Sequence, residues 1–154
     1  FQFVVLNEAI EKVLTLIEHE ARAEHVTIET NFQVDLPNIL GDTKLLQQSI
    51  FDIISNSRWA IAEARKEGGK ITIKTEYAPQ RRAVIVSISD TGIGISKENL
   101  DKIFEPFFTT KPVGQGTGLG LSIVYGVIKE HKGEISVESE INKGTTFKIM
   151  LPVH

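Results

Sequence analysis

The sequence predicts an α+β fold, a two-layer α/β sandwich in which a mixed five-stranded sheet carries three main helices on one face. Three observations predict it. Five segments are rich in β-branched residues or alternate apolar with polar residues, as half-buried strands do. Three longer segments repeat apolar residues at helical spacing. The order of these segments mixes hairpins with crossovers, and one sheet with helices on a single face accommodates that order most economically.

The first quarter of the chain should contain one helix between short strands. Residues 1–6 are expected to form a short strand, and Asn7 is expected to cap a helix that ends near Ala23. Alternation of apolar and polar residues over 26–34 predicts a strand with one buried face. Residues 39–40 follow a turn and are expected to form a short edge strand.

The longest helix is predicted over residues 42–67, with an apolar stripe that faces the core. Beside this stripe, Gln48, Asp52 and Asn56 are spaced four apart and therefore share one face of the helix. A solvated helix face is the simpler interpretation of this polar line. The alternative is that Asn56 supplies an amide oxygen to a hydrated Mg²⁺, an ion that prefers oxygen ligands and is usually shared with substrate phosphates.

The remaining elements are two hairpins and two helices. The predicted strand pairs cover residues 70–77 with 83–89 and residues 134–138 with 145–151. Between the hairpins, Ser96 should cap a short helix that extends to about Ile103, and residues 118–132 should form the last long helix.

Two glycine clusters, about twenty residues apart, resemble two walls of one site, because glycine lets a ligand approach the bare backbone. The first cluster follows a strand that ends at Asp90, whose carboxylate can accept a hydrogen bond from a planar NH₂ group. The second, residues 114–121, opens the last helix, where free N–H groups favour phosphate. Each cluster alone is weak evidence, since most glycine-rich turns are simply turns.

Two common phosphate-binding loops are excluded. A dinucleotide fingerprint placed on the second cluster would need glycine where Leu119 or Leu121 stands. The chain has one Gly-Lys pair, Gly69-Lys70, and Ile71 follows it where a P-loop requires a hydroxyl.

Composition limits the class of protein. A length of 154 residues fits one domain with a sizeable core, and 41% hydrophobic with 24% charged residues is ordinary for a globular domain. The net charge of -3 argues against nucleic acid or an anionic membrane as the main partner. The chain has no cysteine, which excludes disulfides and fits a reducing compartment. It begins at Phe1 rather than Met, so we expect a fragment of a longer protein.

Four features in a fixed order resemble the ATP-binding catalytic domain of sensor histidine kinases. They are the helix that carries Asn56, the segment Asp90-Thr91-Gly92-Ile93-Gly94, the Phe-rich residues 104–108, and residues 116–121. The same resemblance extends to the wider ATPase group of gyrase, MutL and the heat-shock chaperone of that type, and it implies a Bergerat-type ATP-binding fold. It covers nearly the whole chain, and four ordered motifs are far more specific than any one of them.

The resemblance implies a role for individual residues. Asp90 resembles the carboxylate that recognises the adenine amino group, Gly92 and Gly94 would admit the base, and Thr145 is similar to a hydroxyl that reaches adenine through water. Asn56 matches the Mg²⁺ ligand. The residues that match the backbone around the phosphates are Gly116, Gly118, Leu119, Gly120 and Leu121, and Thr110 and Thr117 are further candidate cofactor-binding residues.

The resemblance also implies an aromatic anchor for a lid over the site. Phe104, Phe107 and Phe108 match this anchor, and we expect them to belong to the core as well. The polar, glycine-rich residues 109–117 are the expected lid, because ordering such a segment is costly.

Two positions depart from the usual pattern on the long helix. Asp52 stands where Asn or Glu is common, and Trp59 stands where the family often carries a cation near the phosphates. Arg58 should point away and is a poor replacement, so we expect Lys111 to supply this charge. The candidate catalytic residues are therefore Asp52, as base or proton-orienting group, together with Asn56 and Lys111.

The expected function is transfer of the γ-phosphate of Mg-ATP to a histidine in two-component signal transduction. His19-Glu20 resembles the start of the acceptor motif, but Ala23-Glu24 stands where Asn or Thr followed by Pro would be needed. Residues 1–154 should thus form a single catalytic domain, with the acceptor-histidine dimerisation domain upstream and a response regulator receiver domain as the next partner. We expect a cytoplasmic, monomeric fragment, without nucleic acid or direct membrane contact, whose parent is either free or membrane-anchored.

Two alternatives remain at this point. In an ATPase of the gyrase or MutL type, Asp52 would activate water. In a non-catalytic nucleotide sensor, Trp59 would mark the loss of transfer.

Overall fold

The computed structural model describes residues 1–111 and 120–153. Its helices and strands, in chain order, are β1 Gln2–Val4, α1 Leu6–Ala23, β2 Val26–Phe32, β3 Ile39–Gly41, α2 Thr43–Glu63, β4 Gly69–Ala78, β5 Ala83–Asp90, α3 Lys97–Leu100, α4 Gly120–Glu130, β6 Glu134–Glu140 and β7 Gly144–Pro152.

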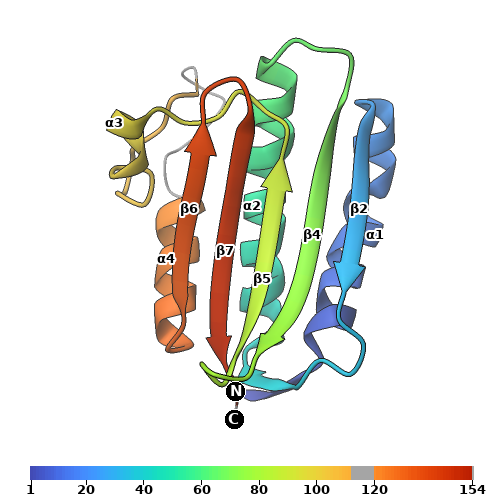
Figure 1. The fold of residues 1–154 in the computed structure, drawn as a ribbon, viewed down its shortest axis with the longest axis vertical. Helices are drawn as coiled ribbons and strands as arrows, with labels where there is room; N and C mark the ends of the chain where they lie inside the picture. Colours follow the sequence, from blue (N-terminus) through green and yellow to red (C-terminus); the bar gives the residue numbers. More distant parts are fainter. Residues whose placement is uncertain (112–119, 154) are drawn as a thin grey trace.

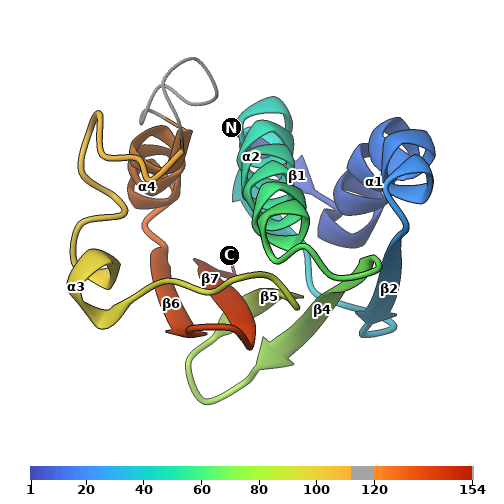
Figure 2. The same ribbon diagram turned by 90° about the horizontal axis from the view of Figure 1, so that it is seen from above.

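The elements form two layers (Figure 1). A five-stranded sheet has the order β2-β4-β5-β7-β6, in which β2 runs parallel to β4 and the other neighbours are antiparallel. Helices α1, α2 and α4 pack side by side on one face of this sheet, as the view from above shows (Figure 2). The predicted α+β sandwich with a mixed five-stranded sheet is therefore confirmed.

The core lies between these layers. From the helices, Ile10, Ile53 and Ile128 are fully buried, and from the sheet Ile73 and Ile88 are fully buried. Burying one such side chain stabilises the fold by about 1.5–3 kcal/mol, so the apolar stripes read from the sequence do hold the helices on the sheet. A second, two-stranded sheet pairs β1 with β3, which confirms the two short strands predicted there.

The structure corrects the prediction that Asn7 caps the first helix. Helix α1 begins at Leu6, two residues before the start that a cap at Asn7 would give, and Val5 at its cap position makes no side-chain cap hydrogen bond. Asn7 instead donates from Nδ2 to the Gln33 carbonyl at 3.0 Å and accepts at Oδ1 from Thr75 Oγ1 at 2.8 Å. A side chain that local sequence marks as a cap thus joins α1 to the sheet.

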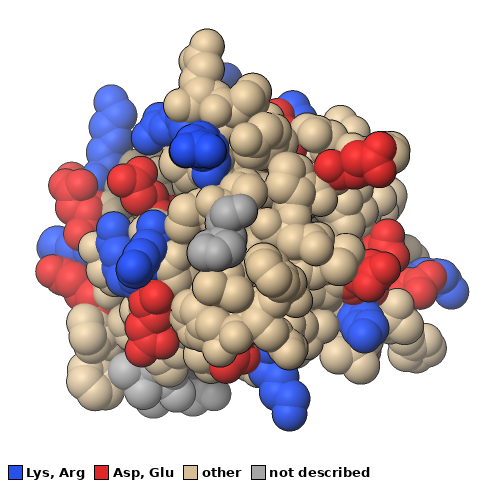
Figure 3. Space-filling model, turned by 90° about the horizontal axis from the view of Figure 1, so that it is seen from below, with Lys and Arg blue, Asp and Glu red and all other residues tan. Residues whose placement is uncertain are grey.

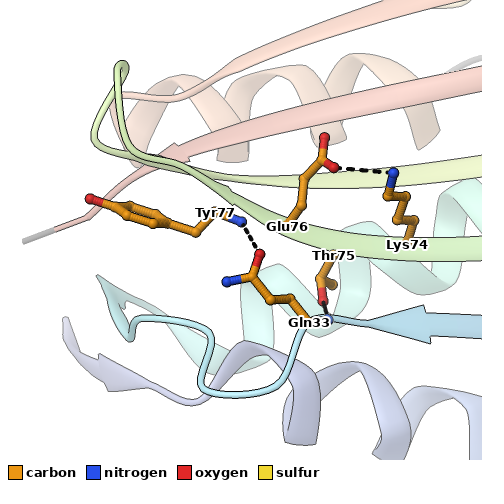
Figure 4. Close-up of polar contacts among 5 residues, drawn as sticks. All are labelled: Gln33, Lys74, Thr75, Glu76 and Tyr77. Atoms are coloured by element: carbon orange, nitrogen blue, oxygen red, sulfur yellow. Dashed lines mark hydrogen bonds and ion pairs between the residues drawn. The ribbon is translucent and has the colours of Figure 1, made fainter.

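The strand β2 also ends earlier than predicted, at Phe32 rather than residue 34. Figure 4 shows the contacts at this end of the strand. The Gln33 side chain accepts at Oε1 from the backbone amide of Tyr77, 2.9 Å away, and the backbone amide of Gln33 donates to the Thr75 hydroxyl. The Gln33 side-chain oxygen thus occupies the position of a backbone carbonyl, and the hydrogen-bond ladder between β2 and β4 ends there. Val34 consequently stays 81% exposed, where alternation had predicted burial.

Two predicted helices are shorter than expected. Helix α2 ends at Glu63 rather than residue 67, because Arg65 and Gly68 adopt left-handed backbone with φ of 55° and 74°. Helix α3 ends at Leu100 rather than Ile103, although Ser96 caps it as predicted by accepting from the Asn99 amide.

Both chain termini lie at the lower end of the molecule in Figure 1. Seen from below, uncharged atoms fill most of the middle of this end, and acidic and basic side chains are interspersed toward its rim (Figure 3). In the parts of the chain that the structure describes, no helix has both the length and the apolar character of a membrane span.

Replacing His131 with Ala should lower the free energy of unfolding by about 1–3 kcal/mol, because the change leaves the partly buried Asp42 amide without its partner. The ring is 4% exposed, accepts at Nε2 from the Asp42 amide at 2.9 Å, and pairs through Nδ1 with the Val127 carbonyl at 2.8 Å. Urea unfolding measures the effect. The exposed His19 is the control, and an equal loss in His19→Ala would contradict this reading of His131.

Candidate nucleotide site

A cavity of about 400 Å³ opens between α2, the carboxyl end of β5 and the start of α4. The predicted site residues that line it are Asp52, Asn56, Asp90, Gly94, Thr110, Lys111, Gly120, Leu121 and Thr145. Gly92 lies beside the cavity without lining it, and Gly116, Thr117, Gly118 and Leu119 lie outside the described residues. Segments that are far apart in the sequence thus line one cavity.

Asp90 lies at the end of β5, between its partners Ile71 on β4 and Thr145 on β7. Its side chain is buried, 8% exposed, and the Gly92 amide donates to Oδ1 at 2.8 Å. Burial raises the pKa of Asp90, while the Gly92 amide, the nearby Ser57 hydroxyl and the Thr145 backbone lower it in part. The site therefore holds a desolvated carboxyl that can pair with a hydrogen-bond donor on a ligand.

Ser57 is a site residue that the sequence analysis placed only in the apolar stripe of the helix. It is 1% exposed and lines the cavity, close enough to Asp90 for its hydroxyl to lower the carboxyl pKa. Yet Oγ has no hydrogen-bond partner of good geometry in the described structure. A hydroxyl within an apolar stripe, directly after Asn56, was the signal that could have found it. A buried polar atom in this condition favours a ligand or water nearby.

The loop after β5 is held in place by close contacts at glycine. A side chain on Gly92 would meet the Ala60 Cβ at 2.6 Å, so this glycine lets the loop pack directly on α2. Gly94 has a φ of 78° and lies against the backbone of Glu140. The Ile93 amide also donates to the Ala60 carbonyl at 3.1 Å. Packing alone thus accounts for glycine at both positions, and admission of a base there stays a prediction.

Two charged side chains line the cavity where α2 faces the segment that ends at Lys111: Asp52 and Lys111. Gln48 Nε2 donates to Asp52 Oδ1 at 3.0 Å, and the Lys111 ammonium lies 5.6 Å from the centre of the Trp59 ring. Burial raises the pKa of Asp52, whereas the Gln48 hydrogen bond and the Lys111 charge lower it in part. Burial lowers the pKa of Lys111, and the Asp52 charge opposes that change. Arg58 points away, as predicted, and pairs with Glu24 at 2.7 Å.

The three phenylalanines of residues 104–108 have different surroundings. The Phe104 ring packs against Tyr125, at 5.5 Å between centroids, and against Phe147 at 6.5 Å, while Phe108 lines the cavity. Phe107 is 75% exposed and has a φ of 67°. The interpretation of these residues as core is therefore wrong for Phe107, whose backbone turns its ring outward.

Comparison with known proteins agrees with this geometry. Residues 41–154 match the family model described as histidine kinase-, DNA gyrase B-, and HSP90-like ATPase. Sensor kinase CckA of Brucella abortus is 45% identical over 131 residues, which are 77% of this chain and 13% of that protein. Sporulation kinase C of Bacillus subtilis is 40% identical over 149 residues, 96% of this chain and 33% of that protein. The chain thus spans about a third or less of these relatives.

Solved structures are similar over almost the whole chain. The nucleotide-free catalytic domain of histidine kinase ThkA has a TM-score of 0.82 and 35% identity, with 99% of this chain and 96% of that chain covered. Full-length ShkA in complex with AMPPNP has a TM-score of 0.84 and 27% identity, with 97% and 30% covered. The buried acid, the glycine loop and the helix that carries Asn56 occur together in a chain that belongs to the histidine kinase-, DNA gyrase B- and HSP90-like ATPase family.

Proposed function

We propose that this domain binds Mg-ATP and transfers the γ-phosphate to a histidine on a separate helical dimerisation domain. One observation carries the proposal: a single cavity joins the buried carboxyl of Asp90 to the polar line Asp52–Asn56 on α2 and to the first turn of α4. The ATPase family supports the nucleotide, and the kinase names of the similar proteins support the transfer.

The adenine would lie at the Asp90 end of the cavity. The carboxylate accepts a hydrogen bond from the amino group, and the unpartnered Ser57 hydroxyl and the buried Thr145 offer further polar atoms, directly or through water. The triphosphate would extend toward Gly120 and Leu121, where the first free N–H groups of α4 favour negative charge. Backbone contacts from residues 116–119 remain part of the proposal.

Mg²⁺ would be held by the Asn56 amide oxygen together with phosphate oxygens, and it would neutralise charge on the transferring group. Within residues 1–111 and 120–153, no cluster of three or more His, Cys, Asp or Glu could hold a metal by itself. One amide oxygen of Asn56 together with phosphate oxygens suits an ion that binds as a complex with the nucleotide.

In the transfer, an imidazole nitrogen of the acceptor forms a bond to the γ-phosphorus as the bond to the β,γ-bridging oxygen breaks and ADP leaves. Asp52 would take the imidazole proton, and its raised pKa suits a base at neutral pH better than that of an exposed carboxylate. Lys111 would stabilise the charge on the phosphates.

The partners belong to the proposal as well. The acceptor-histidine domain would come from the same protein and would contact the exposed Phe107 beside the cavity. A response regulator would then receive the phosphate; one solved ThkA structure, 30% identical, is a complex with the response regulator TrrA. We assign residues 1–154 to one monomeric domain that works in the cytoplasm.

Replacing Asn56 with Ala in the full parent protein should weaken Mg²⁺-dependent ATP binding at least about tenfold, because an oxygen ligand is lost. It should also abolish labelling by γ-labelled ATP. Isothermal titration with and without Mg²⁺ and recovery of acid-labile phosphohistidine measure the two effects. Asn31→Ala is the matched control, since Asn31 is exposed on β2, away from the cavity.

Two outcomes would overturn the proposal. Steady ADP release without phosphohistidine would favour hydrolysis, with Asp52 activating water. Mg-ATP binding without either product would favour a nucleotide sensor.

A further inference from the structure

Trp59 is the only tryptophan in the chain, and it lies on α2 three residues after Asn56. The side chain lines the cavity, and the Lys111 ammonium lies over its ring, 5.6 Å from the centroid. Lys111 follows α3 in the chain, so the contact joins two parts of the cavity lining that are 52 residues apart in the sequence. An indole face attracts a cation more strongly than any other side-chain ring.

The ammonium needs such support because a lysine has a long, flexible stem that loses rotamer freedom when it is held in one place. Lys111 is also partly desolvated, as the lowered pKa indicates, and Asp52 is the charged group whose field acts on it. Asp52 is itself engaged by Gln48 at 3.0 Å. The ring and the carboxylate therefore share the task of holding one cation at the cavity.

We propose that Trp59 is a positioning residue that holds the Lys111 ammonium over the cavity, so that the cation for the triphosphate comes from across the site rather than from α2. This inference rests on the proposed function and deepens it. On this inference Trp59 works in place of a helix-borne cation and is not the mark of a lost transfer activity.

The first test needs no nucleotide. Since Trp59 is the only fluorophore of its kind, its emission reports the ammonium over the ring. Lys111→Met should change the intensity or the emission maximum, whereas Lys102→Met, at an exposed position outside the cavity, should leave both unchanged. Identical spectra for the wild type and Lys111→Met would overturn the contact.

The second test is a double-mutant cycle on nucleotide affinity, measured by isothermal titration. Lys111→Met should weaken Mg-ATP binding about tenfold, and Trp59→Leu should weaken it about 3- to 10-fold. The double variant should bind no more weakly than Lys111→Met, because the ring acts through the cation. Trp59→Phe should keep most of the affinity, and adenosine, which has no phosphate, should bind the wild type and all four variants equally.

The outcomes separate this inference from the proposed function. Additive losses in the cycle, or equal losses for adenosine, would remove the role of Trp59 while ATP binding itself stands. If the wild type bound no ATP, the proposed function would fail, and this inference would fail with it. If the emission of Lys111→Met also equalled that of the wild type, the Trp59–Lys111 contact itself would be overturned.

Discussion

Asp90→Asn should weaken ATP binding about 10- to 100-fold, because a hydrogen bond to a charged acceptor is worth roughly 1.5–3 kcal/mol. The carboxylate is a buried acceptor in the cavity, at the end where we propose that adenine binds, and an amide in its place presents a weaker acceptor and an unwanted donor. Isothermal titration with ATP measures the loss. Asp101→Asn is the matched control, since Asp101 is exposed and does not line the cavity.

The same substitution should stabilise the nucleotide-free domain at neutral pH. The pKa of Asp90 in the folded state lies above its ordinary value of 3.8, so the folded state binds the proton more tightly than the unfolded state. The stability that this carboxyl contributes is fully present below 3.8 and is lost as pH rises through the folded pKa. Asparagine removes this loss.

Urea unfolding between about pH 4 and about pH 8 tests the sign. The stability difference between Asp90→Asn and the wild type should be small at the acidic end, grow with pH and then level off. A variant that is less stable at neutral pH and still binds ATP normally would contradict both the burial and the binding role of this carboxyl.

Gly144→Ala should lower the free energy of unfolding by about 2–6 kcal/mol, since strained backbone and overpacking each cost about 1–3 kcal/mol. Gly144 begins β7 with a φ of 135°, a conformation that favours glycine, and an added Cβ would collide with the Asp90 carbonyl oxygen. Because Asp90 pairs with the neighbouring Thr145, the collision should also reduce ATP affinity. Urea unfolding and nucleotide titration measure the two effects.

The control for Gly144 lies in α4. Among the described residues, a Cβ added to Gly126 would meet no heavy atom within 4 Å apart from its chain neighbours and the backbone of its own helix, so Gly126→Ala should stabilise the domain by about 0.5–1 kcal/mol through helix propensity. The two substitutions should therefore change the free energy of unfolding in opposite directions, with the larger change at Gly144. If Gly144→Ala left the free energy of unfolding unchanged, the turn before β7 would be able to move without disturbing Asp90.

Much of the architecture was predictable because local sequence carries the relevant signal. Helix α2 places Gln48, Asp52 and Asn56 on one face, and this follows from a spacing of four residues alone. Likewise, the alternation along β7 marks Phe147 and Ile149 as buried, and both are. Periodicity of this kind is fixed by backbone geometry and does not depend on which elements meet.

The errors occurred where a side chain finds its partner far along the chain. Asn7 was expected to cap α1, yet it binds Thr75, 68 residues away. Phe107 was expected in the core, but a left-handed φ turns it to the surface. In both cases local preference was outweighed by tertiary contacts or by backbone conformation that the residue type does not reveal.

The sequence by itself determined the strands, the helices and the residue types that gather at the cavity, because these depend on spacing along the chain. Only the tertiary structure decided that Ser57, near Asp90, finds no hydrogen-bond partner among the described residues and that Trp59 lies beneath Lys111. The physical reason is that desolvation, charge and ring contacts depend on distances in space, and those distances exist only once the helices have packed on the sheet.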